Sequence, residues 1–248
     1  GLLGYVGAKT GLSLDLLSQR AFGEKGSYLP SAMTSFTQIG WFGVGSFVSG
    51  GTATPNFARF AKNGKAGAIT TVVAFFIGNS LMFFFGAVSS IFVGGNDIFE
   101  VMVRLNLFYL AVLVLGLNIW TTNDNALYTA GLGLANIFHQ RKKPMVLLSG
   151  IIGTVASVWL YYNFCGWLNI LNCTLPPVGM ILVLAYFMNK KDFETDQPKL
   201  KTVDWFAVAG VILGAIVANL LHWGIASING MVVAAVCYCV GQAVNKRK

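Results

Sequence analysis

Long apolar runs separated by short basic clusters are the dominant pattern of this chain. Four uncharged runs exceed the roughly 20 residues that cross a bilayer as a helix: 26–58, 66–96, 144–189 and 205–245. From Lys65 onward the pattern predicts six membrane-spanning helices, at about 66–94, 105–138, 145–164, 167–188, 205–221 and 228–245. No segments alternate apolar and polar residues over about 10 positions, as the strands of a membrane barrel do. We expect an all-α transmembrane bundle forming a single domain, residues 1–248.

The connections between these spans are short. We expect outer loops at Asn96 to Arg104 and His222 to Ser227, and inner loops at His139 to Pro144 and Asn189 to Asp204. Pro144 suits the first turn of a helix, where its missing N–H is no loss.

Composition places the chain in a lipid bilayer. Hydrophobic residues make up 55% of it and charged residues 10%, and its mean hydropathy is +0.66. A soluble globule of this size exposes far more charge. The chain is therefore expected to be an integral membrane protein.

The net charge of +8 is explained by topology rather than by nucleic acid. If the chain changes sides at each span after Arg59, Arg104 stands alone on one side. The other side collects Arg59, Lys62, Lys65, Arg141, Lys142, Lys143, Lys190, Lys191, Lys199, Lys201, Lys246, Arg247 and Lys248. Basic loops stay in the cytoplasm, so these loops and the C-terminus are predicted to be cytoplasmic.

The same rule fails at one place. Lys9 to Lys25 and Arg59 to Lys65 are both basic and should both be cytoplasmic, yet only residues 26–58 separate them. Two complete spans with a turn need about 40 residues or more. Either this stretch is a re-entrant pair of half-helices or the chain omits a block near residues 43–47; we favour the omission.

The segment Gly116 to Ala126 carries the strongest functional signal. Asn118, Thr121, Thr122 and Asn125 recur at helical spacing and form one polar stripe at membrane depth, where such groups mark a transport path. Two adjacent hydroxyls with a nearby carbonyl supply the oxygen ligands that a hard cation such as sodium needs.

Asn123 and Asp124 point away from this stripe and can serve a different neighbour. Asp124 is the only acid inside any predicted span. It either holds a donor-rich ligand or a proton, or is a structural group bonded to a facing helix.

Gln38 and Trp41 lie three residues apart on one helical face. An indole stacks on a planar ring while an amide pairs with the ring's edge. The alternative is an interfacial tryptophan beside a glutamine that bonds a neighbouring helix.

The segment Ser46 to Pro55 combines small hydroxyl residues with Gly50, Gly51 and a proline. It favours a broken helix, whose freed backbone groups can coordinate a substrate or an ion. A plain helix kink is the alternative.

Catalysis has little support, because both histidines lie in predicted loops and no nucleophile–base or paired-carboxylate arrangement occurs. The four cysteines have no metal-ligand spacing and are expected to be packing residues. We expect neither an enzyme nor an organic cofactor.

Four segments give the chain a recognisable family likeness: Gly4–Leu12, Phe22–Ser27, Gln38–Gly45 and Gly116–Tyr128. They resemble the nucleobase–cation symporter-1 family, and the likeness continues through Trp159–Trp167 and Pro176-Pro177. The resemblance implies twelve helices, ten of them in two inverted five-helix repeats, with the first and sixth helices broken. Against that pattern the chain lacks the first helix, most of the second, part of the third, and the fourth and fifth, with a discontinuity near 45–46.

The resemblance also implies residue roles. Trp41 and Phe47 would sandwich a pyrimidine, and its edge would be paired by Gln38, Ser46, Ser49, Asn123 and Asp124. Sodium would be held by the Asn118 carbonyl and the Thr121 and Thr122 hydroxyls. The remaining sodium ligands would come from the first helix, which is absent here.

The expected function is sodium-coupled import of cytosine across the bacterial inner membrane by alternating access, without an obligate protein partner. Two alternatives remain open. The cargo is another flat ring, such as another nucleobase or a hydantoin, or the chain is a non-transporting membrane fragment.

Overall fold

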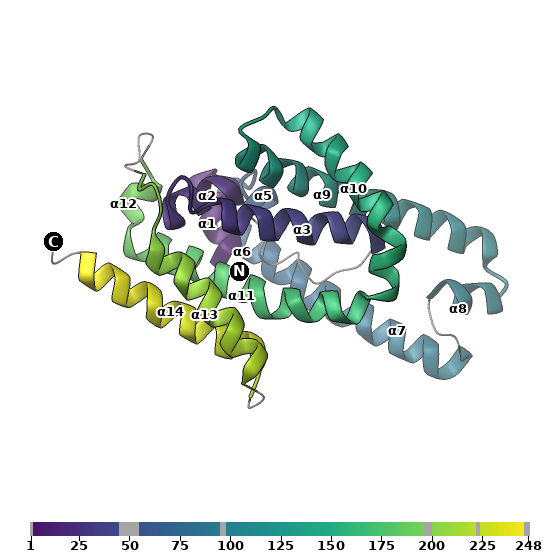
Figure 1. The fold of residues 1–248 in the computed structure, drawn as a ribbon. Coiled ribbons are helices and arrows are strands. Elements are labelled where there is room, and N and C mark those ends of the chain that lie inside the picture. The colour runs from purple at the N-terminus through teal and green to yellow at the C-terminus, as the bar shows by residue number, and fades with distance from the viewer. Residues whose placement is uncertain (1, 45–54, 95–97, 196–199, 222–223, 246–248) are drawn as a thin grey trace.

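A computed structural model describes residues 2–44, 55–94, 98–195, 200–221 and 224–245, with all side chains except those of 38–44, 75, 79, 161 and 245. All regular structure in these ranges is helical (Figure 1). The elements are α1 Leu2–Thr10, α2 Leu14–Phe22, α3 Tyr28–Val44, α5 Pro55–Ala58, α6 Gly64–Val72, the π-helical η1 Val73–Gly78, α7 Asn79–Val93, α8 Ile98–Arg104, α9 Phe108–Phe138, α10 Lys142–Tyr162, α11 Phe164–Met188, α12 Lys190–Phe193, α13 Trp205–Leu220 and α14 Ala226–Asn245.

The predicted spans are present as helices. Within the described residues, four stretches are long and apolar enough to cross a membrane: Gly64–Val93, Lys142–Leu160, Phe164–Met188 and Ala226–Val244. The helix Trp205–Leu220 is apolar but shorter. α9 is long enough but less apolar, because it contains the polar run from Asn118 to Asn125. The all-α transmembrane bundle is thereby confirmed.

Two predicted loops contain helices, and the prediction was wrong there. Ile98–Arg104 forms α8, which is stabilised by an ion pair between Glu100 and Arg104, one turn apart at 2.5 Å. Lys190–Phe193 forms the short helix α12. Both segments contain charged residues, which concealed their helical periodicity.

One hydrophobic core joins the N-terminal helices to the C-terminal half. Leu17 of α2, Ile181 and Tyr186 of α11, Val211 of α13 and Tyr238 of α14 are among its fully or almost fully buried members. α13 and α14 cross closely at small residues: a Cβ on Gly214 would lie 2.7 Å from the carbonyl of Gly230. Small residues at a crossing are typical of helix contacts in membranes.

The second core joins α9, α10 and α11. It contains Ala126, Leu160, Trp167, Leu171 and Leu175. α3 packs along α9 and α10 beside this core, so the helix that bears Gln38 and Trp41 is held next to the helix that bears the polar stripe.

Not all of the chain lies in this compact body. α7, α8 and the first half of α9 extend away from it, toward the right in Figure 1. Their apolar side chains are exposed, including Phe84 and Phe92 on α7 and Leu113 and Trp120 on α9. This part of the protein presents apolar surface either to lipid or to helices that the described chain does not supply.

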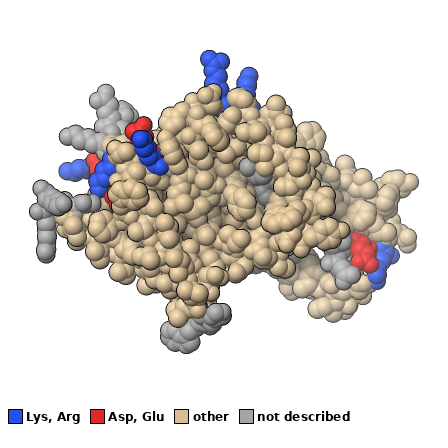
Figure 2. Space-filling model, viewed as in Figure 1, with Lys and Arg blue, Asp and Glu red and all other residues tan. Residues whose placement is uncertain are grey.

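Charged residues mark the two ends of the molecule differently. Figure 2 shows Lys and Arg side chains along the left and upper edge, where Figure 1 has α12 and the turn between α9 and α10. We call this the basic end; Lys142 and Lys143 begin α10, Lys190 begins α12, and Arg20 donates to the carbonyl of Asp192 on α12. Arg104, paired with Glu100, belongs to α8, which lies at the opposite end of the molecule in Figure 1. Which side of a membrane the basic end faces stays a prediction.

Candidate functional site

α9 carries the predicted polar stripe as one continuous helix. The helix runs for 31 residues from Phe108 to Phe138 and ends where His139 adopts a left-handed conformation. Asn118, Thr121, Thr122 and Asn125 therefore share one face, as their spacing predicts.

This stripe lies largely open. Asn118, Thr121 and Asn125 are exposed, and Thr122 is half-buried. The Thr121 hydroxyl donates to the carbonyls of Leu117 and Asn118, both at 3.1 Å. A hydroxyl that donates within its own helix keeps its oxygen lone pairs for a cation.

Asn123 and Asp124 lie off the polar stripe, and their side chains have different hydrogen-bond environments. Oδ1 of Asn123 is buried and has no hydrogen-bond partner among the described residues. Oδ2 of Asp124 accepts a hydrogen bond from the Trp120 indole at 3.1 Å. Buried polar atoms are almost always paired, so the Asn123 oxygen is available to a ligand or to water.

α3 runs antiparallel to α9 with a register that the contacts fix. The Tyr28 hydroxyl lies 3.5 Å from Nε2 of His139, and Nδ2 of Asn136 donates to Oγ of Ser31 at 2.8 Å. Further along, Oγ of Ser35 donates to the Ala130 carbonyl at 3.1 Å. Continued by two turns, this register brings the α3 backbone at positions 38–41 alongside the part of α9 that follows Asn123.

Several predicted cargo residues cannot be placed. Gln38 and Trp41 belong to α3, but their side chains lie outside the described part of the structure. Ser46, Phe47 and Ser49 lie outside the described residues altogether. The structure thus brings two of the predicted helices together, while the ring-stacking geometry stays a prediction.

The predicted cation ligands on α9 are oxygen atoms, which suit sodium, but they are too few to fill its coordination shell. Neutral oxygens from Asn118, Thr121 and Thr122 suit a hard monovalent cation, which wants more oxygens than one helix face offers. The described residues contain no group of three or more His, Cys, Asp or Glu able to hold a metal ion. A complete site needs oxygens from another element.

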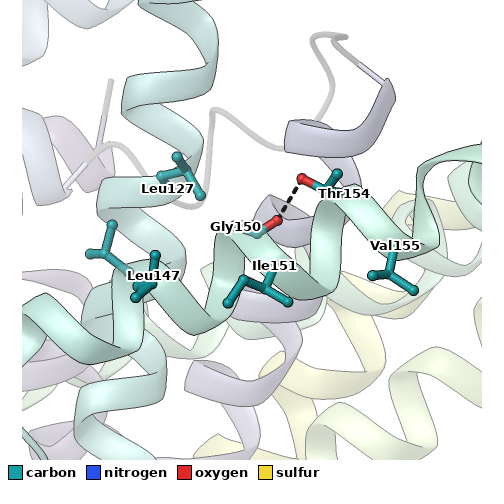
Figure 3. A pocket seen from close by; sticks show the side chains of 7 residues that line it. Leu127, Leu147, Gly150, Ile151, Thr154 and Val155 are labelled. Atoms are coloured by element: carbon teal, nitrogen blue, oxygen red, sulfur yellow. Dashed lines mark hydrogen bonds between the residues drawn. The ribbon is translucent and has the colours of Figure 1, made fainter.

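A cavity of about 420 Å³ between α9 and α10 is unsuitable for a polar ring. Figure 3 shows that it is lined by aliphatic side chains, among them Leu127, Leu147 and Ile151. Its one hydroxyl, that of Thr154, donates to the Gly150 carbonyl at 2.8 Å. The nucleobase edge would find no partner there.

Sequence reasoning gave no role to Asp15 and Asn136, which the structure joins in one buried network at the basic end. Oγ of Ser31 donates to Oδ1 of Asp15 at 2.7 Å and accepts from Asn136. The sequence does contain one indication of this network: Asn136 is the only amide side chain in the otherwise apolar last turns of α9.

Comparison with known proteins adds independent information. The family model described as "Permease for cytosine/purines, uracil, thiamine, allantoin" matches this chain in two parts, residues 1–53 and 43–244.

Three curated relatives are cytosine permeases of Escherichia coli, from strains K12, O6:H1 and O157:H7. Each is 35% identical to this chain in an alignment of 339 positions, which covers 99% of the chain and 80% of the relative.

Proposed function

The chain belongs to the family of permeases for cytosine/purines, uracil, thiamine and allantoin, and we propose that it imports cytosine together with sodium. As a family member with several membrane-length helices, it is a multi-pass membrane protein of nucleobase transport. The observation that carries the proposal is the polar stripe of α9, which lies largely exposed on an apolar helix whose following turns pack against α3. Polar groups in this setting are costly unless they bind something.

The proposed cargo site lies between α3, α9 and the segment that follows α3. Trp41 and Phe47 stack on the two faces of the pyrimidine. Amide, hydroxyl and carboxylate groups pair with its edge; we assign this role to Gln38, Ser46, Ser49, Asn123 and Asp124. The unpartnered Oδ1 of Asn123 supports the assignment, because a ring N–H would satisfy it.

The proposed sodium site uses the Asn118 carbonyl and the hydroxyls of Thr121 and Thr122. Thr121 supports this assignment, because its hydroxyl proton is directed to carbonyls of α9 and its oxygen remains free to coordinate. The rest of the coordination shell would come from an element other than α9.

Coupling follows if both ligands favour the same conformation. Sodium binds the outward-open state better, cytosine then favours closure, and both are released inside; a ligand shifts an equilibrium only through such differential affinity. We place the protein in the bacterial inner membrane with its C-terminus in the cytoplasm. The gathering of Lys and Arg at one end supports this orientation.

We also propose an internal discontinuity near residues 45–46. The alignments with the relatives extend over 339 positions although the chain has 248 residues, and the two family matches overlap at 43–53. Both observations support a missing block between α3 and α5, which on this proposal contains membrane spans. If transport needs that block, the chain alone is a non-transporting fragment.

Another ring is the second candidate cargo, because the family description names purines, uracil and allantoin beside cytosine. Stacking residues discriminate weakly among flat rings, whereas a site built to pair with an edge rejects a ring that lacks it.

Thermal stability in detergent separates these possibilities. The purified chain should unfold at a higher temperature with cytosine in sodium buffer than in potassium buffer, because a ligand that binds only the folded state stabilises it. Uracil, hydantoin and adenine serve as competitors. Equal unfolding temperatures with and without every ring would support the fragment, provided that a chain with the missing block restored responds to cytosine.

A further inference from the structure

The basic end of the bundle is tied by a network of five polar side chains, which we call the Asn136 network. Its members come from α2, the loop that follows it, α3 and α9: Asp15, Gln19, Ser27, Ser31 and Asn136. Ser27 and Ser31 are fully buried, and Asp15 is 6% exposed. Gln19 and Asn136 are half-buried, so the network runs from a buried core at Asp15, Ser27 and Ser31 toward the surface at the basic end.

Asn136 makes more side-chain hydrogen bonds within this network than any other member. Its Nδ2 group donates to Oγ of Ser27 at 3.2 Å and to Oγ of Ser31 at 2.8 Å. Its Oδ1 atom accepts from Nε2 of Gln19 at 2.7 Å. One side chain thereby fixes the end of α9 to both α2 and α3.

A second tie lies about two turns further into the bundle. Arg59, which follows α5, donates through Nη2 to the hydroxyl of Tyr128 on α9. The ammonium of Lys142, on α10, stands 3.5 Å from the centre of the Tyr128 ring. Oδ1 of Asn56 on α5 accepts from the backbone N–H of Leu14 at 2.9 Å. These contacts connect α5 and the residue after it to α2 and α9, and they connect α9 to α10.

Between the two ties, α3 and α9 touch directly. A Cβ on Gly133 would lie 2.8 Å from the Ser31 carbonyl, so only glycine permits this approach. Oγ of Ser35 donates to the Ala130 carbonyl. No passage for a pyrimidine remains between these two helices in this conformation.

The closed arrangement leaves some of its polar groups unsatisfied. Oγ of Ser18, Nδ2 of Asn56, Nε of Arg59 and Oγ1 of Thr129 are buried without a hydrogen-bond partner among the described residues. A buried polar atom without a hydrogen-bond partner destabilises the closed arrangement, and this penalty disappears when water reaches the atom. A junction made of hydrogen bonds and unpaired donors can open at lower cost than an apolar contact.

We propose that the Asn136 network and the Arg59–Tyr128 tie close the exit path at the basic end, with Asn136 as the positioning residue that controls its opening. The proposal rests on the transport function and on the inward orientation of that end. Asn136 lies eleven residues from Asn125, about 16 Å along the helix. It acts on release and does not contact the proposed cargo.

Distance measurement between two spin labels tests this directly. Labels at Leu16→Cys on α2 and Lys143→Cys on α10, both exposed, are introduced after replacement of the four native cysteines. The full chain is placed in lipid nanodiscs without cytosine, and pulsed electron resonance reports the distance distribution. We expect one short distance in the parent protein.

Asn136→Ala removes three hydrogen bonds and should raise the ratio of long to short distances at least about tenfold. Tyr128→Phe deletes one oxygen atom, leaves the ring for Lys142 and should shift the ratio in the same direction by less. Thr154→Ala, whose hydroxyl bonds only its own helix, is the control and should change nothing.

Unchanged distributions in both variants would overturn the proposal. If Asn136→Ala fails to fold, Tyr128→Phe alone decides. The distance measurement needs neither cargo nor sodium. A protein that does not bind cytosine would therefore contradict the proposed function but would leave this test of the closure unaffected.

Discussion

The indole of Trp120 donates a hydrogen bond to Oδ2 of Asp124, one turn further along α9, at 3.1 Å. The pair lies on the part of α9 that leaves the compact body, and Trp120 is 67% exposed. A carboxylate held by its own helix does not require a partner on another helix. Asp124 is therefore either the structural partner of the indole or an acceptor for cargo N–H groups.

Two single variants separate these roles. If Asp124 accepts from the ring, Asp124→Asn should weaken cytosine binding about tenfold or more, because a hydrogen bond to a charged group contributes about 1.5–3 kcal/mol. Trp120→Phe should weaken it far less. Equal small losses in both variants, measured by isothermal titration calorimetry, would assign Asp124 a structural role.

The proposed sodium ligands predict a specific loss in Thr122→Ala. The sodium concentration that gives half-maximal cytosine binding should rise about tenfold, since one oxygen ligand is removed. Thr122→Ser restores the hydroxyl and should restore most of the affinity. Thr154→Ala, on α10, is the matched control; a loss of equal size there would show a general effect of removing a helical hydroxyl.

The stacking role assigned to Trp41 predicts that Trp41→Ala abolishes cytosine-dependent stabilisation while the protein remains folded. Base–aromatic stacking contributes about 1–3 kcal/mol per base, so Trp41→Phe should retain part of the binding. Trp205, 72% exposed on α13, provides the control Trp205→Ala. Equal cytosine responses in the Trp41→Ala and Trp205→Ala proteins would remove Trp41 from the site.

Two glycines on α9, one in contact with α3 and one not, allow a matched test of the α3–α9 contact. Gly133→Ala should lower the free energy of unfolding by about 1–3 kcal/mol, because its Cβ meets the Ser31 backbone. A Cβ added at Gly116 would meet nothing within 4 Å outside its own helix turn, so Gly116→Ala should be neutral or stabilising by up to about 1 kcal/mol. Thermal unfolding in detergent compares the two; a reversed order would contradict the α3–α9 contact.

Asp15 gives a prediction for pH. Burial raises the pKa of this carboxyl above 3.8, against the hydrogen bond from Ser31 and the charge of Arg59. Because the folded protein holds the proton more tightly, the free energy of unfolding falls as pH rises from the unfolded pKa through the folded pKa. Asp15→Asn keeps an acceptor for Ser31 and removes this loss.

The unfolding temperatures of the parent protein and of Asp15→Asn should therefore diverge as pH rises, with the variant the more stable at neutral pH. Taking the difference between the two proteins cancels all other titrating groups. A constant difference across the titration would mean that Asp15 keeps its ordinary pKa in the folded state.

Hydrophobicity determined most of the predicted architecture. The spans of α10, α11, α13 and α14 follow from the length of their apolar runs, because backbone groups in lipid must be paired within a helix. The helical stripe of Asn118 to Asn125 was equally predictable from spacing. α8 and α12 were missed because their charges resemble those of loops.

The contacts at the basic end were beyond prediction from the sequence. Nothing local in Asn136 indicates that it meets Gln19 and Ser31, which lie more than a hundred positions away. Likewise, the sequence marks Arg59 only as a basic loop residue, whereas in the structure its guanidinium donates to the Tyr128 hydroxyl. Contacts of this kind depend on which helices are neighbours in the bundle, and the hydropathy of the sequence does not predict which helices are neighbours.

Uptake of radiolabelled cytosine into proteoliposomes that contain the purified chain tests the central claim most directly. The account predicts accumulation driven by an inward sodium gradient, its loss when choline replaces sodium, and its reduction in Thr122→Ala but not in Thr154→Ala. Accumulation that is equal in sodium and in choline would contradict sodium coupling. No accumulation in either, with folded protein in the membrane, would contradict transport by this chain.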